Sequence, residues 1–140
     1  MKSYIVVLML AVAGMSANCQ SIKVPETVKT AFSAKYPNAS NVKWGKENAK
    51  EYEAEFKLNN NSVSANFGLD GSWVETESVI PASQLPAPVS AAVKAKYPGA
   101  VIALAEKTEQ PGNKVLYEVT VKVNGKKKSV ELNPDGTAAE

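Results

Sequence analysis

One stretch of the sequence occurs twice, and this duplication limits the folds open to the chain. Ala-Lys-Tyr-Pro stands at residues 34–37 and returns at residues 95–98, 61 residues later. Each copy closes a segment with apolar residues at helical spacing and precedes strand-like sequence. We therefore expect two consecutive structural repeats, each a helix followed by strands, that contribute to one sheet.

The segment before each Tyr-Pro pair is predicted to be a helix. Pro25 suits the first turn of a helix at residues 24–36, because its missing N–H is not needed there. Pro37 disfavours helical geometry at the residue before it, so the helix should end at Tyr36. The apolar residues share one helical face in both copies, as Val28, Ala31, Phe32 and Tyr36, and as Val89, Ala92, Val93 and Tyr97.

Alternation of apolar and polar residues predicts strands after each helix. In Glu51–Leu58 the alternation is complete, with apolar residues at every second position. Asp70-Gly71 and Asp135-Gly136 contain the only two aspartates of the chain, and both are assigned to turns. The predicted strands lie at residues 41–44, 51–58, 63–69, 72–80, 101–108, 115–123 and 126–133.

These segments predict an α+β protein. We expect a tandem repeat of a helix plus about four strands, with the two helices packed on one face of a mainly antiparallel, curved sheet of seven or eight strands. The repeats should cover residues 21–80 and 81–140, within a single domain of residues 20–140. Each long strand is apolar on one face only, so the other sheet face is expected to lie open to solvent.

The first 19 residues have the pattern of a secretory signal peptide. Lys2 precedes an apolar stretch at residues 4–15, which is short for a permanent membrane span, and small residues follow it. Cleavage after Cys19, the only cysteine, would release a soluble chain; alternatively, Cys19 is lipidated and anchors the protein. Asn18 fits poorly before a lipidated cysteine, which favours the soluble form. We predict export to the periplasm or medium, with no transmembrane span in the mature chain.

Composition excludes several functions. All 16 basic residues are lysine, histidine is absent, and the formal net charge is +2. Without arginine the chain lacks the bidentate recognition of phosphate and guanine, which argues against nucleic-acid binding. Without histidine it lacks the usual acid–base group at neutral pH and the commonest metal ligand. We predict no cofactor, and a single cysteine permits no disulfide within the chain.

Two clusters of charge allow more than one interpretation. Glutamates recur on one face of the strands at residues 51–58 and 72–80, where they could hold a hard cation or perform acid–base chemistry. We interpret them as a solvated strand surface, and predict no catalytic residue and no metal site. Lys126, Lys127 and Lys128 follow a hairpin turn; they could meet an acidic partner or a membrane surface, but exposed lysines also protect a sheet edge from pairing.

Regular alternation across residues 72–80 would place Trp73 on the open face beside Glu75 and Glu77. An exposed tryptophan among charges is a frequent interface anchor. The second tryptophan, Trp44, is a weaker candidate for the same role. The residues predicted to contact a partner are Glu53, Glu55, Lys57, Trp73, Glu75, Glu118, Thr120 and Lys122.

The chain resembles the PepSY-like family of small exported bacterial proteins. The resemblance is carried by the Tyr-Pro helix ends, by Tyr-Glu at residues 52–53 and 117–118, and by the Asp-Gly turns. It implies a fold similar to that of the β-lactamase-inhibitor protein, with two repeats in a curved sheet backed by helices. The family has no catalytic residues to assign here, and an inhibitory or binding role has been suggested for related PepSY domains.

The sequence therefore predicts an exported, non-catalytic module, binding or inhibitor-like, that uses its open sheet face. Its expected partner is another exported or envelope protein. An envelope structural protein, or a protein that binds a small ligand or a cation, is the alternative. No prediction of oligomeric state follows from the sequence.

Overall fold

The computed structural model describes residues 22–139 and confirms the predicted α+β architecture. The predicted signal peptide and Cys19 lie outside these residues. The first half comprises α1 (Glu26–Lys35), β1 (Ser40–Lys46), β2 (Glu51–Leu58), β3 (Asn61–Gly68) and β4 (Trp73–Val79). The second half comprises the short 3₁₀ helix η1 (Ala82–Gln84), α2 (Ala87–Lys96), β5 (Val101–Gln110), the short 3₁₀ turn η2 (Pro111–Asn113), β6 (Lys114–Val123) and β7 (Lys126–Leu132).

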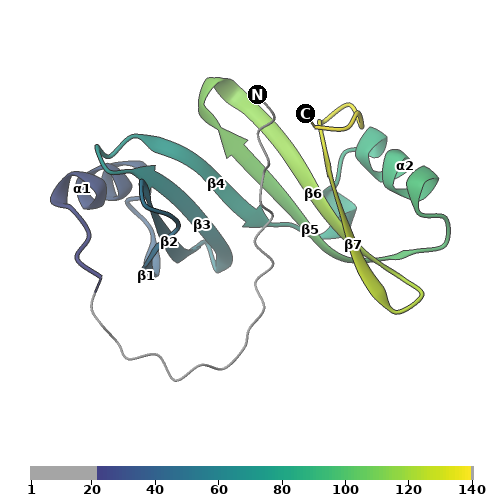
Figure 1. The fold of residues 1–140 in the computed structure, drawn as a ribbon, viewed down its shortest axis with the longest axis horizontal. Helices are drawn as coiled ribbons and strands as arrows, with labels where there is room; N and C mark the ends of the chain where they lie inside the picture. The colour runs from purple at the N-terminus through teal and green to yellow at the C-terminus, as the bar shows by residue number, and fades with distance from the viewer. Residues whose placement is uncertain (1–21, 140) are drawn as a thin grey trace.

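The seven strands form one sheet in chain order, from β1 to β7. Every neighbouring pair is antiparallel. Figure 1 shows α1 beside the first strands and α2 beside the last strands, at opposite ends of the molecule. None of the helices within residues 22–139 is long and apolar enough to cross a membrane.

Both helices end as the Tyr-Pro pairs predict. Tyr36 follows the last residue of α1 and leaves helical geometry, while its N–H still donates to the carbonyl of Phe32 at 2.8 Å. Tyr97 does the same after α2, donating to Val93 at 2.9 Å. The following proline disfavours helical backbone at each tyrosine, so the chain turns into the sheet at equivalent points.

Each helix covers its own hydrophobic core, and both lie on the same face of the sheet. In the first core, α1 packs Val28 and Phe32 against β2 and β3, with the Phe32 ring 5.0 Å from Phe56 and 5.2 Å from Trp44. In the second core, α2 packs Val89 and Val93 against β5, β6 and β7. We call this side of the sheet the helix face and the opposite side the open face.

The two Asp-Gly turns have the same structure, which confirms their assignment from the sequence. Asp70 Oδ1 accepts hydrogen bonds from the Ser72 amide and hydroxyl at 2.9 and 2.6 Å. Asp135 Oδ1 accepts the equivalent bonds from Thr137 at 3.0 and 2.7 Å. These bonds lower the pKa of both aspartates. The Asp70 and Asp135 carboxylates therefore stabilise the two turns.

The glycine after each aspartate lies against a helix. Gly71 has φ +84°, and a Cβ there would stand 2.9 Å from the Thr27 carbonyl oxygen of α1. Gly136 has the same φ, and a Cβ there would stand 2.6 Å from the Pro88 carbonyl oxygen of α2. A side chain at either position would be strained and would push its turn away from the helix.

We predict that Gly71→Ala destabilises the protein by roughly 2–3 kcal/mol, through backbone strain and the contact with α1. Gly125→Ala is the matched control, because Gly125 also has a positive φ (+76°) but a Cβ there meets nothing within 4 Å. The control should lose only about 1 kcal/mol of stability, from backbone strain alone. Urea unfolding measures both, and equal losses would show that the turn does not depend on its contact with α1.

Candidate functional site

The open face carries mainly polar side chains of the long strands, with Thr108 and Leu116 buried among them (6% and 2% exposed). One row crosses five strands, from Glu55 in β2 through Ser64, Glu77 and Thr108 to Leu116 in β6. Within residues 22–139 no helix covers this face, because both cores lie on the other side. The predicted open face is therefore present.

Seven of the eight predicted contact residues lie on this face. Glu53 is in register with Asn66, which is in register with Glu75. Glu118 stands between Glu106 and Glu131. The remaining four pair with neighbours on the same face: Glu55 with Ser64, Lys57 with Ser62, Thr120 with Ser129, and Lys122 with Lys127. Pairing shows where these side chains lie; their contact with a partner stays a prediction.

Trp73 lies on the helix face, so its predicted placement was wrong. β4 contains a bulge at Val74: Asn66 pairs with Glu75, whereas Phe67 pairs with Trp73. The extra residue breaks the alternation and turns Trp73 to the side of Phe67. There the indole packs against the first core, as does Trp44. Neither tryptophan is an anchor on the open face.

The face gathers more carboxylates than the sequence suggested. Eight glutamates lie on it: Glu51, Glu53, Glu55, Glu75, Glu77, Glu106, Glu118 and Glu131. Glu106 and Glu131 were missed, although continuing the alternation through residues 101–108 and 126–133 would have found them. No three carboxylate, cysteine or histidine side chains of the described residues are placed to hold a metal ion.

The crowded carboxylates hold protons more tightly than isolated ones. Burial raises the pKa of Glu77 to about 7, with further contributions from Glu75, Glu106, Glu118 and Glu53. Burial, followed by neighbouring carboxylates, also raises the pKa of Glu53, Glu106 and Glu131. The face is therefore a region of concentrated negative charge whose magnitude responds to pH near neutrality.

Glu75 is the exception, because its carboxylate is already bound within the sheet. Asn66 Nδ2 donates to Oε1 at 3.3 Å and Gln110 Nε2 donates to Oε2 at 3.0 Å. These amides come from β3 and β5, on either side of β4. Glu75 thus links the two halves, and we regard its neighbour Glu77 as the freer acceptor for a partner.

Exposed apolar side chains border the carboxylates. Val79, Leu104 and Val101 are 46%, 36% and 68% exposed. Val79 is in register with Glu106, and Leu104 with Thr120, so both side chains lie on the open face.

Leu104 precedes Glu106 by two residues and lies on the same side by regular alternation, whereas the bulge at Ala103 changes the side of Ile102 and Val101. Sequence reasoning missed Val79 and Leu104, although continuing the alternation of Glu77 and Glu106 would have placed both on this face. Only Val101 reaches this face through the bulge, which leaves no mark in the pattern of residues.

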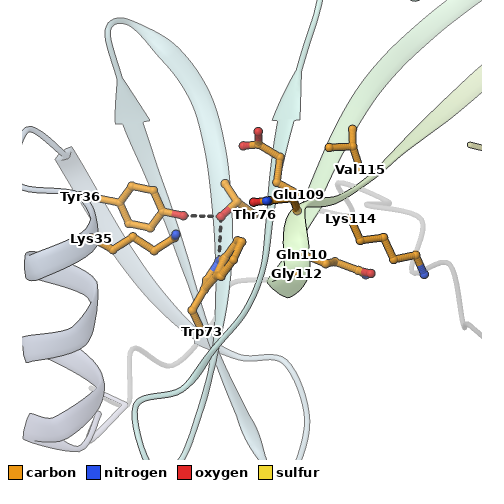
Figure 2. A pocket seen from close by; sticks show the side chains of 10 residues that line it. Lys35, Tyr36, Trp73, Thr76, Glu109, Gln110, Gly112, Lys114 and Val115 are labelled. Carbon is orange, nitrogen blue, oxygen red and sulfur yellow. Dashed lines mark hydrogen bonds between the residues drawn. The ribbon is translucent and has the colours of Figure 1, made fainter. Parts of the chain in front are cut away.

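A second feature lies on the helix face, where the two halves meet. Figure 2 shows a groove between the end of α1, β4 and the β5–β6 turn. Thr76 forms its floor: its hydroxyl accepts a bond from Trp73 Nε1 at 2.9 Å and shares a short hydrogen bond with the Tyr36 hydroxyl. The Lys35 ammonium stands 3.6 Å above the centre of the Trp73 ring. The groove has a volume of about 380 Å³.

The comparisons with known proteins agree with this fold. The chain matches a family described as "Putative beta-lactamase-inhibitor-like, PepSY-like" over residues 15–62 and again over residues 50–137. It therefore belongs to this family, as its motifs predicted. Comparison with curated proteins finds no match.

Solved structures of Bacteroides proteins share the fold at low sequence identity. One, from Bacteroides eggerthii, is described as "putative periplasmic proteins"; it is 21% identical with a TM-score of 0.77, covering 84% of this chain and 87% of that one. A DUF2874 family protein from Bacteroides ovatus is 23% identical with a TM-score of 0.75, covering 84% and 86%. A BLIP-like protein from Bacteroides fragilis is 22% identical with a TM-score of 0.73, covering 86% of each chain.

We predict that stability falls as the pH rises through the carboxylate titration. Because the folded pKa of Glu77 is raised to about 7 from 4.5, the folded chain holds this proton more tightly than the unfolded chain. Its contribution to stability is complete below about pH 4.5 and is lost as the pH rises through about 7.

Glu77→Gln should therefore stabilise the protein at about pH 8 and make little difference at about pH 4.5. Urea unfolding at the two pH values measures the change. An equal effect at both would contradict this assignment, because removing a charge that titrates between them cannot act uniformly.

We also predict that Thr76→Val destabilises the protein by about 1–3 kcal/mol, because it leaves the Trp73 indole N–H and the Tyr36 hydroxyl without their shared partner. Thr108→Val is the matched control: both threonines are buried (5% and 6% exposed), but the Thr108 hydroxyl has no side-chain hydrogen bond among the described residues. The control should be close to neutral in urea unfolding. Equal losses would show that the hydroxyl network adds nothing.

Proposed function

We propose that the open face binds an exported or envelope protein, and that the chain acts as a non-catalytic, inhibitor-like binding module. The observation that carries this proposal is the juxtaposition of exposed Val79 and Leu104 with a row of carboxylates on a sheet face that no helix of the described residues covers. Apolar side chains left exposed beside polar ones are typical of protein interfaces.

The partner surface should combine apolar and basic side chains. An apolar anchor would meet Val79 and Leu104, while lysine or arginine side chains beside it would pair with Glu77 and Glu106. Desolvated charge pairs of this kind contribute specificity, because a partner with acidic residues at the same places would be repelled. The contact set therefore keeps seven of the eight predicted residues, omits Trp73 and adds Glu77, Glu106, Val79 and Leu104.

The proposal includes the location of the protein. The predicted signal peptide at residues 1–19 supports export, and the similar structure from Bacteroides eggerthii is described as periplasmic. We propose a periplasmic protein whose repeats at residues 21–80 and 81–140 form a single domain. The family description is inhibitor-like, which favours binding over catalysis.

Charge reversal at the centre of the face tests this proposal. We predict that Glu77→Lys lowers capture of the partner from an envelope extract at least about tenfold, because a lysine there repels basic partner side chains. Leu104→Ser should lower capture as well, by removing an exposed apolar contact. Quantitative affinity capture with purified variants measures both.

Glu26→Lys is the matched control, since it makes the same charge change on the exposed surface of α1, away from the open face. It should capture the partner as the parent protein does. The proposal is wrong if all three variants capture equally, or if Glu26→Lys alone reduces capture. Thermal melts of each variant separate lost binding from lost folding.

A further inference from the structure

The groove on the helix face is built from both halves of the molecule. Lys35 and Tyr36 come from the end of α1, and Trp73 and Thr76 from β4. The opposite wall comes from the β5–β6 hairpin, from Glu109 to Val115. Pockets for small ligands occur preferentially at such junctions between structural units.

This wall exists because the second repeat departs from the first. Tyr97 follows Tyr36 by 61 residues, whereas Tyr117 follows Tyr52 by 65, so four residues are added between helix and second strand. β5 is accordingly ten residues long where β1 has seven. The two halves meet at a seam, where β4 pairs with β5. The longer hairpin extends past this seam and faces the end of α1, as Figure 2 shows.

The α1 wall presents the Lys35 ammonium, and the hairpin wall presents the Glu109 carboxylate together with Lys114. Lys35 forms no ion pair among the described residues, and its ammonium is held over the Trp73 ring by a cation–π contact of 3.6 Å. Across the groove, Glu109 pairs with Lys107 at 2.7 Å through Oε1, and its second oxygen has no bond to another described side chain. The Glu109 carboxylate also contributes to the raised pKa of Tyr36, whose main cause is burial.

The floor between these charges is largely aromatic and rigid. The Tyr36–Thr76–Trp73 hydrogen bonds fix the phenol and the indole, and Val115 adds an apolar side chain beside them. A volume of about 380 Å³ accommodates a molecule the size of an amino acid or a dipeptide.

We propose that this groove binds a small zwitterion, an amino acid or short peptide, with its carboxylate on Lys35 and its ammonium on Glu109. A simple anion at Lys35 would face the Glu109 carboxylate, and a simple cation at Glu109 would face Lys35 and Lys114. A molecule with both charges meets a complementary group on each wall, and its apolar part lies on Trp73 and Val115. The site is independent of the proposed open-face function, since it lies on the opposite side of the sheet.

Fluorescence of Trp73 tests the proposal directly. The chain has two tryptophans, so Trp44→Phe leaves Trp73 as the single indole. In this background, titration with L-phenylalanine and with L-alanyl-L-phenylalanine should give a saturable change for at least one of them. Comparing the two distinguishes a free amino acid from a peptide as the ligand.

Ligand analogues that lack one charge test the recognition. N-acetyl-L-phenylalanine has no ammonium and L-phenylalanine amide has no carboxylate, so each should bind at least about tenfold more weakly than the parent zwitterion. Equal binding of either analogue would overturn the assignment of the corresponding wall. No saturable change with either zwitterion up to about 10 mM would overturn the site.

Lys35→Met and Glu109→Gln should each weaken binding of the zwitterion at least about tenfold. Lys29→Met is the matched control, because Lys29 is exposed on the same helix and does not line the groove. Equal weakening by Lys29→Met would overturn the proposal. The open-face capture assay should be unchanged by these variants, so failure of one proposal leaves the other open to test.

Discussion

The ladder between β4 and β5 is the interaction on which both faces of the molecule depend. It joins two helix-covered halves that each have a core of their own. Four registered residue pairs form this ladder, from Thr76–Glu109 to Val79–Glu106. Because side chains alternate across an antiparallel pair, this register places both helices on one side of the sheet and aligns the polar rows on the other. A slip of one residue in this register would turn the core of the second half to the opposite side of the sheet from the core of the first half.

The open face concentrates negative charge where the fold itself gains little from it. Burial and mutual repulsion raise the pKa of four of its glutamates. Such carboxylates oppose folding when ionised, and a basic partner would relieve the repulsion. This relation between stability and binding supports the proposed role of the open face in binding another protein.

The two repeats are alike in their cores and differ at their ends. The Phe67–Trp73 pair of the first half corresponds to the single bridge between Leu132 and Ala138 in the second, so alanine occupies the position equivalent to Trp73. The extended β5–β6 hairpin adds Glu109 and Gln110 at the seam. Gln110 binds Glu75 on the open face, while Glu109 faces the groove on the helix face. The departures from symmetry thus gather at the junction, where both proposed sites draw residues from both halves.

The sequence by itself determined the features that depend on neighbours along the chain. Tyr36 and Tyr97 end helices because proline follows them, Asp70 and Asp135 hold turns through local bonds, and alternation assigned seven contact candidates to one face. Only the tertiary structure decided the rest. The bulges at Val74 and Ala103 reversed the sides of Trp73 and Val101, because the extra residue of a bulge shifts the alternation of the residues beyond it. Register across β4 and β5 brought the carboxylates together and opened the groove, since contacts between distant segments have no signature in either segment alone.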